Sequence, residues 1–184
     1  MTGMDTHLIA AGLPALGWAI HGGLLLRRLS TARRDPLTGL HTRAGWTTRA
    51  EHLIAKHPGA LVLLIDLDDF KAINDTHGHA AGDAVLTATA RRLAHWCGRH
   101  GIAARLGGDE FAAIVTHPDK TPGLDALQTA LDHPVDHHGN ALPVSASVGH
   151  CHCADLPAPS LTDALSAADH SMYAAKGHGR RNTH

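Results

Sequence analysis

The chain has 184 residues, with 16 Lys and Arg, 17 Asp and Glu, and a formal net charge of -1 at pH 7. This length allows one domain with a full apolar core and a short additional segment. Because the charges balance, no overall field favours nucleic acid or an anionic membrane surface, and we expect neither as the main partner.

Residues 8–26 are a candidate for a membrane-spanning segment. They carry no formal charge, and their length reaches the lower limit for a membrane-spanning helix. The arginines that follow would keep the rest of the chain in the cytoplasm. Pro14 and His21 weaken a lone span, so a soluble helix that forms a dimer stalk is equally open. We expect an N-terminal helix and basic linker over residues 1–34 and a folded domain over residues 35–184.

The segment after Asp35-Pro36 predicts a sheet with helices packed on it. Proline ends any preceding helix, and the apolar periodicities that follow predict the order helix, strand, helix, helix, hairpin, helix, strand, helix. Residues 60–65 form an uninterrupted apolar run, which is typical of a central strand covered on both faces. Pro143 to Val148 predicts a further strand. The expected fold class is α/β, in the mixed α+β sense.

Amphipathic helices are located by apolar residues that recur at helical spacing. The first follows Thr42, and the last has Ser160 or Thr162 available as its N-cap. We interpret the stripes, and Tyr173 beside the last one, as packing residues. The stripes comprise Trp46, Ala50 and Leu53; Leu86, Ala90, Leu93 and Cys97; and Leu161, Leu165, Ala168, Met172 and Ala175.

A hairpin with acid at its tip is predicted where Gly107-Gly108-Asp109-Glu110-Phe111 lies between the apolar runs 102–106 and 112–115. Paired glycines permit a tight reversal, and without side chains they let a bulky anion approach the backbone. A site for a metal ion and a phosphate needs both properties. The alternative is a solvated acidic turn, which we disfavour.

A second acidic segment, Asp66-Leu67-Asp68-Asp69, follows the apolar strand directly. Asp66 and Asp68 share one face by the period of two, and Asp109 meets Asp66 if the hairpin lies beside this strand. Three converging carboxylates repel one another unless a cation holds them, and oxygen ligands suit magnesium. For Asp68 and Asp69 alone, we favour the alternative of acids at a helix N-terminus.

Sequence blocks in a fixed order carry a family resemblance from Asp35 to Asn182. They are Asp35–Leu40, Asp66–Asp83, Arg105–Phe111, Val144–Gly149 and Ala168–Asn182. With these blocks the chain resembles the GGDEF-domain diguanylate cyclases. The resemblance implies a palm-like, mixed and largely antiparallel sheet flanked by helices, as in nucleotidyl cyclases. It also implies GTP as substrate, two magnesium ions per active site with manganese as a substitute, and cyclic di-GMP and pyrophosphate as products.

The resemblance implies a metal and catalytic set on the strand and the hairpin. Asp66 and Asp109 would bind magnesium through their carboxylates, and Leu67 through its carbonyl oxygen. Glu110 would assist at the metal or the nucleophile, and Asp109 could accept the proton of the attacking hydroxyl. Lys71 would lie near the phosphates, with a surface lysine as the alternative.

The resemblance also implies a substrate-binding set. Asn74 and Asp83 would recognise guanine, because a carboxylate accepts the N1 and amino hydrogens of that base, and Asp83 therefore favours GTP over ATP. His79 would lie near the sugar and phosphates. Lys176 and Arg180, four residues apart, would hold the triphosphate tail, with a solvated helix end as the alternative.

The chain departs from the family pattern in two places. The inhibitory product site of the family needs Arg-x-x-Asp where this chain has Gly98-Arg99-His100-Gly101, so we expect no direct product feedback. Thr42 and Trp46 replace the usual asparagine and phenylalanine, which changes the expected packing near the first helix.

The function we expect is a diguanylate cyclase that is active as a homodimer, because each domain holds one GTP and the two must meet. The N-terminal segment would raise the effective concentration, as a stalk or as a tether to the cytoplasmic face of the membrane. A GTP-binding regulator without turnover is the second hypothesis. The third, a histidine-rich metal carrier, rests on 18 histidines that lack regular ligand spacing.

Overall fold

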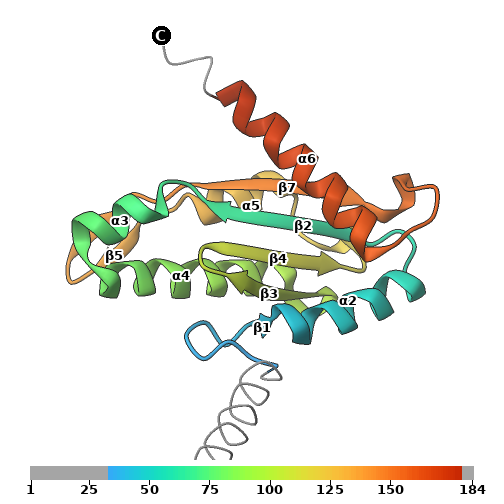
Figure 1. Ribbon diagram of the computed structural model, residues 1–184, viewed down its shortest axis with the longest axis horizontal. Helices are drawn as coiled ribbons and strands as arrows, with labels where there is room; N and C mark the ends of the chain where they lie inside the picture. The colour runs from blue at the N-terminus through green and yellow to red at the C-terminus, as the bar shows by residue number, and fades with distance from the viewer. Residues whose placement is uncertain (1–32, 180–184) are drawn as a thin grey trace, which may run out of the picture. The chain divides into compact units, whose positions relative to one another are not determined.

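The computed structural model describes the backbone of residues 33–179 and side chains as far as residue 174 (Figure 1). The predicted span or stalk over residues 8–26, the Lys176 side chain and Arg180 lie outside the described residues, so their roles stay predictions. Within residues 33–179, no helix is long and apolar enough to cross a bilayer.

A five-stranded sheet has the spatial order β1, β3, β4, β2, β7. β1 pairs with β3 in parallel and every other pairing in this sheet is antiparallel, which confirms the expected mixed, largely antiparallel sheet. The strands are β1 (His41–Thr42), β2 (Leu61–Leu67), β3 (Gly101–Gly107), β4 (Glu110–Val115) and β7 (Ala146–His152). The helices are α2 (Arg43–Lys56), α3 (Phe70–His77), α4 (His79–Cys97), α5 (Leu124–Leu131) and α6 (Leu161–Gly179).

The two faces of the sheet carry separate cores. Leu63 and Ile65 of β2 belong to the core that contains residues of α4 and α5, whereas Val62 belongs to the core that contains residues of α2 and α6. Figure 1 shows α4 and α6 on opposite sides of the sheet. Each fully buried Leu, Ile or Val side chain contributes about 1.5–3 kcal/mol. The two-sided burial confirms the interpretation of residues 60–65 as a strand covered on both faces.

Side chains fix the starts of the first and last of these helices. Thr42 Oγ1 accepts a hydrogen bond from the Gly45 N–H at 3.3 Å as the N-cap of α2. At α6 the cap is Ser160 rather than Thr162, because the Ser160 Oγ accepts from the Asp163 N–H at 3.1 Å. Each helix therefore begins just before its apolar stripe.

Two aromatic residues on these helices differ in burial. Trp46 is fully buried, and its Nε1–H donates to the Ile102 carbonyl at 3.3 Å, so the larger indole is accommodated with its polar group satisfied. The interpretation of Tyr173 as a packing residue is wrong, because this residue is 80% exposed. Tyr173 follows Met172 by one position and therefore lies off the apolar stripe of α6.

Some strands differ from the predicted ones. β5 (Val135–His137) and β6 (Asn140–Leu142) form a separate two-stranded hairpin that was not predicted. Three residues are too few to show a period of two, so the pattern does not reveal these strands. The strand expected over Pro143 to Val148 begins at Ala146 and continues to His152, since proline lacks the N–H that a ladder needs.

Candidate active site

The β3–β4 hairpin places two acidic residues at one end of the sheet. Gly107 and Gly108 have φ angles of 151° and 52°, and Gly108 and Asp109 form the turn before Glu110 starts β4. The left-handed conformation of Gly108 would cost a residue with a side chain about 1–2 kcal/mol. The predicted hairpin with acid at its tip is confirmed, and glycine allows its turn without strain.

Arg105 attaches this turn to residues 35–38. Its Nε donates to the Gly108 carbonyl at 2.9 Å, and its Nη1 lies 3.5 Å from Asp35 Oδ1. The same Asp35 oxygen accepts from the Thr38 N–H at 2.8 Å and from the Thr38 hydroxyl at 2.6 Å. Burial opposes the ionisation of Asp35, but the Thr38 hydrogen bonds and the Arg105 charge outweigh it and lower the Asp35 pKa.

The register between β2 and β4 decides which acid faces Asp66. Asp66 is the direct partner of Glu110, and the Leu67 N–H donates to the Asp109 carbonyl at 3.3 Å. The structure thus places Glu110, not Asp109, opposite Asp66, so the expected pairing is shifted by one residue. Direct partners share a face, and side chains alternate along a strand, so both carboxylates emerge on the face of Val62, where α2 and α6 pack.

The carboxylates of Glu110 and Asp68 each contact a neighbouring side chain. Glu110 Oε2 lies 3.4 Å from Arg43 Nη2, and the Ser147 hydroxyl donates to Asp68 Oδ1 at 2.7 Å. Among the side chains that the structure describes, no three His, Cys, Asp or Glu could hold an ion together. The expected convergence of Asp66, Asp68 and Asp109 is therefore not present, and Asp68 is instead bound by Ser147 of β7.

The oxygen donors on β2 and the hairpin nevertheless fit a small, hard cation. Magnesium is usually bound by one or two protein carboxylates together with water and substrate phosphates, so three converging acids are not required. Asp66 and Asp109 come from segments joined by the hydrogen bond between Leu67 and Asp109. The set offers only carboxylate and carbonyl oxygens, which are the ligands that magnesium prefers.

The predicted guanine-binding residues lie on α3 and α4, which are joined at Gly78 with a φ of 82°. The Asn74 amide donates to the Phe70 carbonyl at 3.3 Å, and its Oδ1 lies against Gly82 of α4. A methyl group on residue 82 would collide with this oxygen. Asp83 is the next residue and is exposed. The fold thus brings Asn74 to the helical turn that carries Asp83.

Lys71 and His79 are exposed on the same pair of helices. Lys71 is the second residue of α3, and His79 is the first residue of α4. In the described part of the chain, neither side chain forms an ion pair. Both are therefore accessible to an incoming anion, and their contacts to sugar and phosphates stay predictions.

Sequence reasoning assigned no role to Arg43, Ser147 or Gly149. Gly149 of β7 lies directly against α6, because a methyl group there would collide with the Ala168 carbonyl and with Met172. This contact sets how closely α6 packs on the sheet. A glycine inside a strand pattern is a recognised sign of close backbone approach, so Gly149 could have been found, whereas Arg43 and Ser147 carry no spacing signal.

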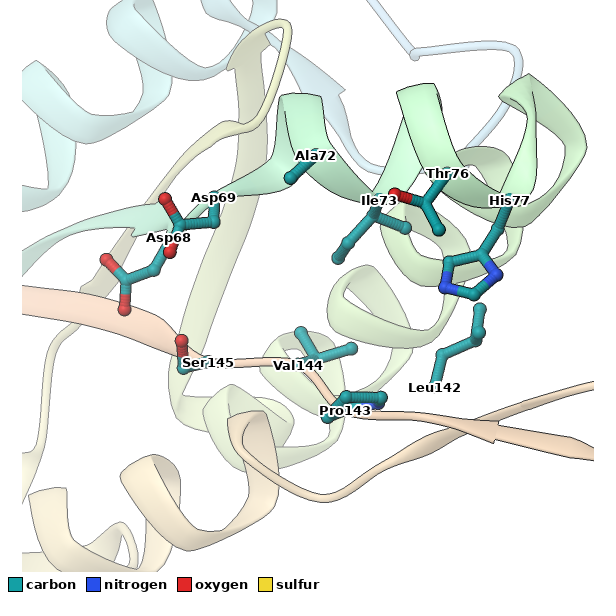
Figure 2. Close-up of a pocket in the computed structure, with 10 residues that line it drawn as sticks. All are labelled: Asp68, Asp69, Ala72, Ile73, Thr76, His77, Leu142, Pro143, Val144 and Ser145. Carbon is teal, nitrogen blue, oxygen red and sulfur yellow. The ribbon is translucent and has the colours of Figure 1, made fainter.

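A pocket of about 350 Å³ opens between α3 and residues 142–145 (Figure 2). Figure 2 shows Asp68, Asp69 and Ser145 toward one end of the pocket and His77 toward the other. It shares no lining residue with the predicted metal, catalytic and guanine-binding sets. Asp69 precedes α3, as the helix N-terminus interpretation expects, but with a φ of 51° and no side-chain capping hydrogen bond.

Known proteins share this sequence pattern and this fold. Residues 32–182 match the family model described as diguanylate cyclase, GGDEF domain. An uncharacterized 19.3 kDa protein of Streptomyces ambofaciens is 64% identical over 180 residues, which cover 98% of each chain. Diguanylate cyclase DgcN of Escherichia coli is 39% identical over 157 residues, which cover 80% of this chain and 38% of DgcN. A crystal structure of a sensory box/GGDEF family protein from Caulobacter crescentus has a TM-score of 0.71 at 34% identity, covering 80% of this chain and 99% of that chain.

Proposed function

The chain belongs to the GGDEF-domain family of diguanylate cyclases, and we propose that it condenses two GTP molecules into cyclic di-GMP with release of pyrophosphate. The observation that carries this proposal is the placement of Asp66 opposite Glu110 and of Leu67 beside Asp109, next to the turn at Gly108. Carboxylates, a carbonyl and a glycine pair without side chains occur together, as a triphosphate and a cation require.

The reaction is a phosphoryl transfer carried out twice. The 3′-hydroxyl oxygen of one GTP forms a bond to the α-phosphorus of the other, the bond to the β-phosphate oxygen breaks, and pyrophosphate leaves. The proton of the hydroxyl passes to a carboxylate, for which Asp109 and Glu110 are the candidates. Asp66, Asp109 and the Leu67 carbonyl would hold magnesium, which when bound neutralises phosphate charge and lowers the pKa of the hydroxyl.

Arg43 and Arg105 position the acidic turn. Arg43 Nε donates to the Leu106 carbonyl at 3.2 Å, and the same side chain contacts Glu110. Arg105 binds the Gly108 carbonyl. These contacts restrict the turn before substrate arrives, so less order has to be gained when GTP binds.

Substrate recognition would be shared among the remaining predicted residues. Asp83 would accept the two guanine hydrogens, and Asn74, held against Gly82, would bind the base oxygen or ring nitrogen. Adenine lacks this donor pair, so GTP would be preferred. The phosphate-binding side chains would be Lys71, His79, Lys176 and Arg180.

The proposed active state is a homodimer without product inhibition. One domain presents one nucleotide, and the attacking and receiving GTP molecules must face each other. Gly98-Arg99-His100-Gly101 contains no carboxylate, and the Arg99 Nε donates to His100 Nε2 at 3.2 Å. The segment therefore lacks the acid that the inhibitory site of the family needs.

The test is turnover of the purified full chain with GTP and magnesium, with cyclic di-GMP measured by mass spectrometry. We expect product from the wild type and a loss of roughly a thousandfold in Asp109→Ala. Asp119→Ala changes an exposed acid beyond the other end of β4 and should keep full activity. GTP binding without product at high protein concentration would instead support the GTP-binding regulator.

A further inference from the structure

A groove between α4 and α5 lies outside the candidate active site. Its volume is about 500 Å³, within the range of small-molecule pockets. One wall is the α4 face that carries Arg91 and His95, and the other includes Ala126 and Ala130 of α5. The alanines leave room between the helices, because a larger residue at either position would fill the space.

Two side chains of α4 form hydrogen bonds to the backbone near the two ends of α5, at the ends of the groove. Arg92 Nη1 donates to the Leu131 carbonyl at 3.2 Å and its Nη2 to the Pro134 carbonyl at 2.9 Å, where α5 ends. Trp96 Nε1–H donates to the Gly123 carbonyl at 3.3 Å, just before α5 begins. Both ends of α5 are thus tied to α4, and the groove between them is a fixed feature of the fold.

Arg91 places a positive charge at the rim of the groove, and His95 lies beside it. Arg91 and His95 are exposed and lie one helical turn apart, and no acidic side chain is among the described residues that line the groove. Neither of the ion pairs in the described part of the chain involves a lining residue. Burial lowers the pKa of Arg92, and the neighbouring charge of Arg91 lowers it further. A bound anion would relieve this repulsion.

We propose that this groove binds a small organic anion, with its apolar body between α4 and the Ala126 and Ala130 wall of α5 and its carboxylate or phosphate at Arg91 and His95. The charge of Arg91 complements the anionic group, and the apolar lining residues Ala88, Ala126 and Ala130 complement the body. Residues 98–101, where the family would place its inhibitory product site, do not line the groove. The proposed metal, catalytic and guanine-binding residues do not line it either, so the two proposals are independent.

Isothermal titration calorimetry of the full chain with 1-naphthoate tests the charge requirement. We expect one naphthoate per chain, and the uncharged analogue 1-naphthamide should bind about tenfold more weakly. Arg91→Gln should weaken naphthoate binding about fivefold to tenfold. Arg49→Gln removes an exposed arginine of α2, outside the groove, and should leave binding unchanged. Equal binding of naphthoate and naphthamide, or unchanged binding in Arg91→Gln, would overturn the proposal.

Ala126→Leu tests the location. Ala126 is exposed at the groove, so a leucine there should fill the space while the protein keeps its thermal unfolding midpoint. We expect this variant to lose naphthoate binding at least tenfold. Sedimentation velocity is the second readout: self-association that Ala126→Leu abolishes, without naphthoate binding to the wild type, would show that a second copy occupies the groove and would contradict the proposal.

Discussion

The strand half and the helical half of the candidate site are held in different ways. The strand half is Asp66, Leu67, Asp109 and Glu110, and the helical half is Asn74 and Asp83. Ladder hydrogen bonds and two arginines fix the strand half, whereas the helical half rests on the close contact between Asn74 and Gly82. In the proposed site, bond-making geometry would depend on the backbone register of the strands, and base recognition would depend on side chains of α3 and α4. Damage to the first should lower kcat, and damage to the second should raise KM.

The largest effect is expected in the strand half, from Asp66→Asn. The neutral amide is a poor magnesium ligand, so cyclic di-GMP formation should fall roughly a thousandfold. Initial rates measured by mass spectrometry check this, and thermal unfolding checks that the fold is kept. Asp136→Asn, an exposed acid of β5, is the matched control and should retain its rate. An Asp66→Asn protein with a near-normal rate would remove Asp66 from the metal set.

In the helical half, Asp83→Ala should raise KM for GTP about tenfold to a hundredfold and leave kcat within a few-fold of the wild type. The lost carboxylate leaves the guanine hydrogens unpaired. Steady-state kinetics over a range of GTP concentrations separate the two constants. Asp75→Ala, at an exposed position of α3, is the control. If kcat fell as far as in Asp66→Asn, the division of the site into two halves would be incorrect.

Gly82→Ala tests the helical half by displacing the Asn74 side chain while every polar group is kept. The added methyl collides with the Asn74 Oδ1, so KM should rise about tenfold and the free energy of unfolding should fall by about 1–3 kcal/mol. Gly59→Ala is the control, because a Cβ there meets no heavy atom within 4 Å. Kinetics and denaturant unfolding give both quantities, and an unchanged KM would mean that the Asn74 contact does not set base recognition.

The smallest effect is expected from Asp35→Asn, which weakens the attachment of the strand half to residues 35–38. The Asp35 pKa is lowered in the folded protein, so its charge stabilises the fold above the unfolded-state pKa of about 3.9. This contribution is lost as the pH falls through the lower folded-state pKa. The wild type should be more stable than Asp35→Asn by about 1 kcal/mol at neutral pH.

Denaturant unfolding over a pH series measures this difference. It should stay constant from neutral pH down to about pH 5 and shrink as the pH is lowered below about 4. A difference between the two proteins that did not change with pH would show that the charge of Asp35 is not what stabilises the fold.

The strand half could be located from the sequence, but its register could not. The glycine pair marks the hairpin, and the apolar run marks β2. β4, however, is buried on both faces from Phe111 to Val115, so a period of two does not show which of its residues faces Asp66. The contacts of Arg43 with Leu106 and of Arg105 with Asp35 join residues 63 and 70 positions apart, which no local pattern reveals.

The helical half was located by family resemblance rather than by periodicity. α3 has no fully buried residue, and Phe70 and Ile73 mark the face that packs on the core, but this pattern does not indicate which residues contact a base. The roles of Asn74 and Asp83 came from the matching block of residues. Their mutual placement depends on the reversal at Gly78 and on the missing side chain at Gly82, and both are properties of the packed helices.

Arg105 connects the start of the described domain, at Asp35, with the acidic turn at Gly108. Asp35 lies where the chain enters the described domain, and the Arg33 carbonyl just before it accepts from the Thr42 N–H at 3.2 Å. The acidic turn is therefore attached by one ion pair to a residue that lies 70 positions earlier in the chain, at the start of the described domain.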